Sequence, residues 1–156
     1  MPTLTKEQFE LRVFKDFAGN HVSGVDLASA RNRVPPEPDV LCDISGKPYY
    51  FELAEVTDED LARSRSESLR TGAETGGPFS QESPLLRIIM SKVQKTYAVG
   101  GVPLNLLLYY YRQYPFQPAI LSGYNQVSLF LAGSPFRNVW IYNDCTKELI
   151  LKTVCH

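Results

Sequence analysis

The run VPLNLLLYYY at residues 102–111 is apolar almost without interruption. A strand with one face in water alternates apolar and polar side chains, whereas a continuous apolar run is typical of a strand buried on both faces. Such a strand needs a packed layer on each side of its sheet. Because helical segments precede and follow it, we expect an α/β fold, with a mixed central β-sheet flanked by helices.

Two helices are predicted from capping signals and apolar spacing. Thr5 and Gln8 form a capping box, and the apolar residues after them are spaced for a helix that ends at Gly19–Asn20. Ser83–Pro84 opens a second helix that ends at Gly100–Gly101. Its apolar stripe is formed by Leu85, Leu86, Ile89, Val93 and Tyr97.

Turn signals divide the rest of the chain. Residues 39–44 and 49–56 are predicted to form a hairpin around Ser45–Gly46. Weaker signals indicate a short strand at 22–25, helices within 58–70 and 117–132, a mobile Gly-rich loop at 71–81, and a last pair of strands at 138–144 and 147–151. We therefore expect one domain over residues 1–156, with a core at about 5–111 followed by a C-terminal helix and strands.

Composition excludes several classes of protein. The net charge of −1 argues against a broad basic face that binds nucleic acid without specificity, although a local basic groove remains compatible with it. The three cysteines are widely spaced, which favours reduced thiols in a cytoplasmic protein. No apolar run has the roughly 18 residues of a membrane span, so we expect no membrane contact.

Two carboxylates interrupt the apolar pattern of the predicted hairpin. A symmetric turn at Ser45–Gly46 places Asp39 directly opposite Glu52, and opposed residues of an antiparallel pair lie on the same face. Such a like-charged pair is unfavourable unless the two groups share a proton or bind a cation. Mg²⁺ is the cation that best suits oxygen ligands held in this way.

A third carboxylate lies on the first helix. At about 100° per residue, Glu10 falls within the face formed by Phe9, Val13, Phe14 and Phe17. A buried glutamate is rare unless it is paired or binds a metal. Glu10 is therefore a candidate for a supporting role at the carboxylate pair.

Residues 5 to 111 resemble the PD-(D/E)XK phosphodiesterase superfamily, which has the restriction-endonuclease-like fold. The resemblance is carried by the inward Glu10, by Pro38–Asp39 at the start of a strand, and by YYFELAEV (49–56) as the next strand. A helix and an apolar strand then follow. It implies that Asp39 and Glu52 bind Mg²⁺ or Mn²⁺ and that Glu10 assists the metal or orients water.

The sequence departs from the family at one position. The resemblance implies a lysine two residues after Glu52, where this chain has Ala54. Some members carry the cation on the following helix, and Lys92 is the best candidate there, whereas Lys95 is expected to point toward solvent. Gln94 and Tyr97 resemble a Gln/Tyr helix motif of some nuclease branches, with different spacing.

Three functional interpretations follow from these residues. The first is a Mg²⁺-dependent nuclease that hydrolyses DNA or RNA, with Glu10 and Lys92 as catalytic residues and Asp39 and Glu52 as metal ligands. The second is a catalytically inactive protein of the same fold that binds a protein partner or forms a homodimer, which Ala54 and the net charge of −1 favour. The third is an unrelated α/β binding protein whose carboxylates form structural ion pairs.

Overall fold

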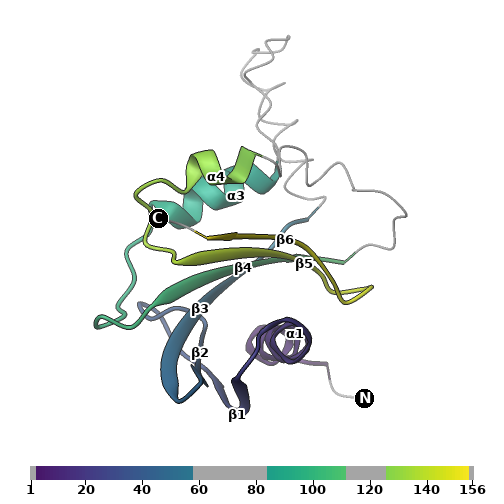
Figure 1. Ribbon diagram of the computed structural model, residues 1–156. Coiled ribbons are helices and arrows are strands. Elements are labelled where there is room, and N and C mark those ends of the chain that lie inside the picture. Colours follow the sequence, from purple (N-terminus) through teal and green to yellow (C-terminus); the bar gives the residue numbers. More distant parts are fainter. Residues whose placement is uncertain (1–2, 58–83, 112–125, 155–156) are drawn as a thin grey trace.

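The computed structural model describes residues 3–57, 84–111 and 126–154 (Figure 1). The regular elements in chain order are α1 (Lys6–His21), β1 (Val25–Asn32), β2 (Val40–Ile44), β3 (Lys47–Glu55), α3 (Pro84–Val93), β4 (Leu104–Tyr110), α4 (Val127–Phe130), β5 (Asn138–Asn143) and β6 (Glu148–Val154). None of the described helices is long and apolar enough to cross a membrane.

The described strands form one mixed sheet in the order β1-β2-β3-β4-β5-β6. Strands β1, β2 and β3 are antiparallel, β4 runs parallel to both β3 and β5, and β6 is antiparallel to β5. The C-terminal strands β5 and β6 thus extend the same sheet. The protein is a single α/β domain, which confirms the predicted fold class at this level.

Helices cover both faces of the sheet (Figure 1). Helix α1 packs on one face, where Phe14 and Phe17 join Phe51, Trp140 and Tyr142 in an aromatic core. Helices α3 and α4 lie over the other face, where a second core forms. Strand β4 is buried along its whole length and contributes side chains to both cores, as its apolar sequence predicts.

The hairpin has the predicted register. Val40 pairs with Phe51 and Ile44 with Lys47, so the paired numbers have a constant sum and the turn is centred on Ser45–Gly46. Both turn residues have positive φ, 51° at Ser45 and 81° at Gly46, which is the requirement of a type I′ turn. The same register, extended by one residue beyond β2, brings Asp39 to Glu52.

Three element boundaries were predicted wrongly. Helix α1 continues past Gly19–Asn20 to His21, β1 runs over Val25–Asn32 and not over 22–25, and α3 ends at Val93 instead of near Gly100. The backbone N–H of Ala98 donates to the carbonyl of Pro36 (2.9 Å), so a tertiary contact draws the chain after α3 away from the helix axis. The predictions for 58–70 and 71–81, and much of that for 117–132, lie outside the described residues.

Candidate functional site

Glu10 is buried by the position that α1 gives it. The helix starts with the predicted capping box, in which Thr5 and Gln8 each accept a hydrogen bond from the other's backbone N–H. This start fixes the rotation of the helix, so Val13, Phe14 and Phe17 face the sheet and Glu10 lies beside them with 6% of its surface exposed. The carboxyl group therefore has little water around it.

Asp39 is held at the start of β2 by the neighbouring strand. Its Oδ2 accepts a hydrogen bond from the backbone N–H of Leu53 (2.8 Å), which directs the side chain toward β3. Burial, followed by the charge of Glu52, raises the pKa of Asp39 to about 6. A hydrogen bond between the two carboxyl groups also favours the protonated form of Asp39.

Glu52 is the most heavily contacted group of the site. Its neighbours in β3, Phe51 and Leu53, point into the core under α1. Because side chains alternate along a strand, Glu52 points to the other face of the sheet, toward α3. Oε2 accepts hydrogen bonds from Lys92 Nζ (2.9 Å), Tyr97 Oη (3.3 Å) and Lys95 Nζ (3.5 Å). All three of these donors reach the same oxygen, and Glu52 is also hydrogen-bonded to the carboxyl group of Asp39.

The two lysines at Glu52 differ in exposure. The Lys92 side chain is 21% exposed and that of Lys95 is 57% exposed. Lys92 is therefore the main counterion of Glu52, and the weaker contact of Lys95 agrees with the expectation that it points toward solvent. Burial and the charge of Glu52 raise the pKa of Tyr97, so Tyr97 contacts Glu52 as a neutral hydroxyl.

Glu10 belongs to the same electrostatic unit without touching the pair. Burial raises the pKa of Glu10 to about 7, and the charges of Asp39 and Glu52 contribute to this rise. Within the described residues, no hydrogen bond or ion pair joins Glu10 to Asp39 or Glu52, and α1 packs on the face opposite to α3. The three acids thus affect one another's ionisation, but only Asp39 and Glu52 are in contact.

The donor set fits one particular kind of metal ion. Among the described residues there is no group of three or more His, Cys, Asp or Glu side chains that can hold a metal. Mg²⁺ keeps several waters and is often bound by one or two carboxylates together with a substrate phosphate. The pair formed by Asp39 and Glu52 is compatible with such a site and not with a closed site made of protein ligands alone.

Sequence reasoning found part of this arrangement. The structure brings Asp39, Glu52 and Lys92 together and leaves Glu10 within electrostatic reach. Tyr97, named in the sequence for a Gln/Tyr motif and for the apolar stripe, lies beyond the end of α3, where its ring packs on the core and its hydroxyl contacts Glu52. The positive charge that Ala54 lacks is thus present on the same face of the sheet, on α3.

No protein-family model matches the sequence, and no curated protein resembles it at a significant level. Function is therefore inferred from the geometry of the described residues. That geometry provides two adjacent carboxyls, a half-buried lysine beside them and a neutral hydroxyl, which together suit the binding of a cation and an anionic ligand at one place.

Proposed function

We propose that the protein is a Mg²⁺- or Mn²⁺-dependent phosphodiesterase of the restriction-endonuclease-like fold that acts on nucleic acid. The observation that carries the proposal is the contact between the carboxyl groups of Asp39 and Glu52, with Lys92 Nζ 2.9 Å from Glu52 Oε2. A purely structural role would favour one carboxylate for each cation. Both lysines of the site contact Glu52, and among the described residues none contacts Asp39, so the pair leaves negative charge that a divalent ion can neutralise.

The order of the elements supports the same proposal. A helix with a buried acid is followed by antiparallel strands, the second of which is preceded by Pro38–Asp39, and then by a helix and a parallel apolar strand. This is the arrangement that the PD-(D/E)XK resemblance implies. The burial of Glu10 on α1 is compatible with the supporting role that the resemblance implies for it.

Each residue of the site has a distinct role in this proposal. Asp39 and Glu52 would hold the metal, which when bound polarises the phosphate and lowers the pKa of a bound water. Lys92 takes the place of the missing lysine and offsets the negative charge of the phosphate. Tyr97 fixes Oε2 of Glu52 by its hydrogen bond, and Glu10 adds negative charge that favours cation binding.

Metal binding is the first test of this function. Mn²⁺ should raise the melting temperature of the wild-type protein, because a ligand that binds only the folded state at a hundred times its Kd stabilises it by about 2.7 kcal/mol. Asp39→Asn should abolish the rise, whereas Asp43→Asn, the same change elsewhere on β2, should keep it. Equal shifts in the two variants would contradict the assignment of Asp39 as a ligand.

Cleavage is the second part of the same test. Plasmid and single-stranded DNA and RNA should be cut in Mn²⁺, and Glu52→Gln and Lys92→Ala should each abolish or strongly reduce the cutting.

One observation favours a second function, a catalytically inactive protein that acts as a binding or assembly module: three donors already converge on Oε2 of Glu52. A metal-dependent rise in melting temperature without cleavage of any of these substrates would select that function.

A further inference from the structure

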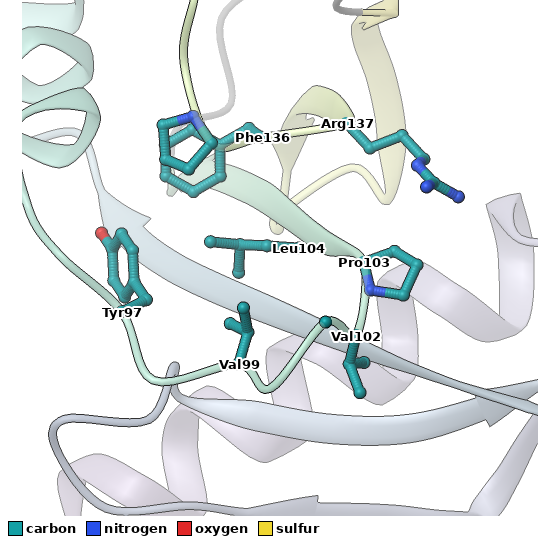
Figure 2. A pocket seen from close by; sticks show the side chains of 9 residues that line it. Tyr97, Val99, Val102, Pro103, Leu104, Phe136 and Arg137 are labelled. Carbon is teal, nitrogen blue, oxygen red and sulfur yellow. The ribbon is translucent and has the colours of Figure 1, made fainter.

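A groove lies beside the carboxylate pair, at the ends where β4 and β5 begin. A cavity of about 350 Å³ is lined by Tyr97, Val99, Leu104 and Phe136, with Arg137 at its rim (Figure 2). Its volume is at the lower end of the range for small-molecule sites, and its walls are mainly apolar. The cavity therefore has room for a unit about as large as one nucleotide.

The cavity continues into a second one. A neighbouring cavity of about 340 Å³ shares Gly101, Val102, Pro103 and Arg137 with the first and adds Lys47, Pro48 and Tyr49. Because four lining residues are common to both, they form one groove with Arg137 near its middle. Such an elongated shape suits a chain better than a compact ligand.

The charges along this groove are all of one sign. Arg137 and Lys47 are exposed, and among the described residues neither makes an ion pair, nor does any Asp or Glu line the groove. Lys95 lies near the other end, where its Nζ is 5.5 Å from the ring centroid of Tyr97, but it is paired with Glu52 and does not line the groove. In a protein with a net charge of −1, two exposed cations on a groove without lining acids are complementary to an anionic chain.

Rings and prolines form much of the remaining wall. Tyr97 and Tyr49 are half-buried at opposite ends, and the ring of Tyr97 packs edge-on against Phe136. Figure 2 shows the Tyr97 ring at one side of the cavity and Arg137 at the other. A positive groove with aromatic side chains is typical of sites for single-stranded nucleic acid, in which phosphates meet cations and bases stack on rings.

Tyr97 connects the groove to the candidate active site. Its ring lines the groove, and its hydroxyl donates to Glu52 Oε2. A strand in the groove would therefore lie within the length of one tyrosine side chain of Glu52. We propose that this groove binds single-stranded nucleic acid and guides it to Asp39 and Glu52, which names the substrate class of the proposed phosphodiesterase and rests on that function.

The groove favours one strand over a duplex for two reasons. Each cavity has the volume of about one nucleotide, so neither can hold a section of double helix. Duplex binding by a protein commonly relies on many phosphate contacts, whereas among the described residues two cations line this groove. A base of a single strand is also free to stack on Tyr97.

Binding of a labelled oligothymidylate, measured by fluorescence anisotropy in EDTA, tests the groove without cleavage. The double variant Lys47→Ala/Arg137→Ala should weaken binding about tenfold at low salt and make the slope of log Kobs against log salt shallower by about 1.4, since each lost phosphate contact on a single strand removes about 0.7. Arg31→Ala/Lys152→Ala removes the same two charges from exposed positions outside the groove and should bind as the wild type does. Equal affinities for the two double variants, or tighter wild-type binding of a duplex, would overturn the inference.

The outcome separates the groove from the proposed function. If the wild type cuts DNA or RNA in Mn²⁺ and both double variants bind the oligonucleotide equally, the groove inference fails and the phosphodiesterase proposal stands. If Lys47 and Arg137 carry oligonucleotide binding but Mn²⁺ neither stabilises the protein nor supports cutting, the groove stands and the phosphodiesterase proposal fails. Arg137→Lys, which keeps the charge, should recover most of the binding that Arg137→Ala loses.

Discussion

Two clusters of buried carboxyl groups among the described residues, each with a member on α1, are built differently. The Asp144 cluster consists of Arg12, Asp16, Asp144 and Lys147. The acid cluster consists of Glu10, Asp39, Glu52, Lys92 and Lys95. Both contain fully or nearly buried carboxyl groups, but only in the first does every acid contact a cation.

Every carboxylate of the Asp144 cluster is paired. The side chain of Asp144 is fully buried, and both its oxygens accept from Arg12, at 2.7 Å for Oδ2 and 3.3 Å for Oδ1. Lys147 Nζ lies 3.1 Å from both Asp144 and Asp16. This cluster ties α1 to the turn between β5 and β6, and its hydrogen bond to Asp144 raises the pKa of Arg12.

The acid cluster has three carboxyls, but both lysines that make contact lie at Glu52, one of them mostly exposed, and Lys6 acts on Glu10 only through its charge. Its electrostatic imbalance appears in the raised pKa values of Glu10, about 7, and Asp39, about 6. Groups with such perturbed ionisation concentrate at functional sites, because binding and catalysis use charge that folding alone would neutralise. The comparison teaches that burial of acids is not itself a functional signal, whereas burial without matching cations is.

The largest difference in the free energy of unfolding should come from an Asp→Asn substitution in each cluster. Asp144→Asn should lower the free energy of unfolding by about 3 kcal/mol, because it breaks the buried ion pair with Arg12. The loss should lie at the low end of the range for buried ion pairs, because Arg12 is partly exposed. Asp39→Asn should leave stability unchanged or higher, because it removes repulsion from Glu52 and keeps an acceptor for Leu53 N–H. Urea unfolding at pH 7 measures both, and similar losses would remove the distinction between the clusters.

The next effect is a dependence of stability on pH that comes from Glu10. Its pKa is higher in the folded protein than the ordinary 4.5, so the folded state binds the proton more tightly and this contribution to stability is complete below about pH 4.5. It is lost as the pH rises from 4.5 through about 7, and a shift of this size corresponds to about 3 kcal/mol as an upper limit.

Glu10→Gln isolates that contribution. At pH 8 the variant should be more stable than the wild type, with a difference that shrinks toward pH 5, and Glu7→Gln on the exposed face of the same helix should show no such trend. Melting temperatures recorded from pH 5 to 8 give the comparison. Parallel curves for the wild type and Glu10→Gln would show that the pKa of Glu10 is not raised, and the contrast between the two clusters would lose this support.

Local signals were enough to predict the acid pair but not its surroundings. The register of β2 and β3 follows from the Ser45–Gly46 turn, and the burial of Glu10 follows from the capping box and helical spacing. The contacts of Tyr97 and Lys95 with Glu52 depend on where α3 ends, and that end has no glycine or proline to mark it. It is set by the distant contact of Ala98 with Pro36, which periodicity cannot show.

The predicted strand at 22–25 missed most of β1 because the order of β1 also depends on tertiary contacts. VDLASARN lacks the strict alternation of apolar and polar residues, and its pairing with β2 shifts register between Asp26 and Arg31. An edge strand with a shift in register gains its order from the neighbouring strand and from α1 more than from its own pattern. The Asp144 cluster escaped notice likewise, since Arg12 and Asp144 are 132 residues apart.

The smallest effects should come from the exposed lysine of each cluster. Lys147→Ala should cost up to about 1 kcal/mol, because Lys147 bridges two carboxylates although its side chain is 42% exposed. Lys95→Ala should cost less than about 0.5 kcal/mol, because its single contact is 3.5 Å long and its side chain is 57% exposed. Urea unfolding at low and high salt distinguishes the two lysines. Salt screens ion pairs, and only Lys147, which bridges two carboxylates, should lose a measurable part of its contribution to stability at high salt. If Lys95→Ala were the more costly change, Glu52 would depend on both its lysines for stability, and the acid cluster would resemble its paired counterpart.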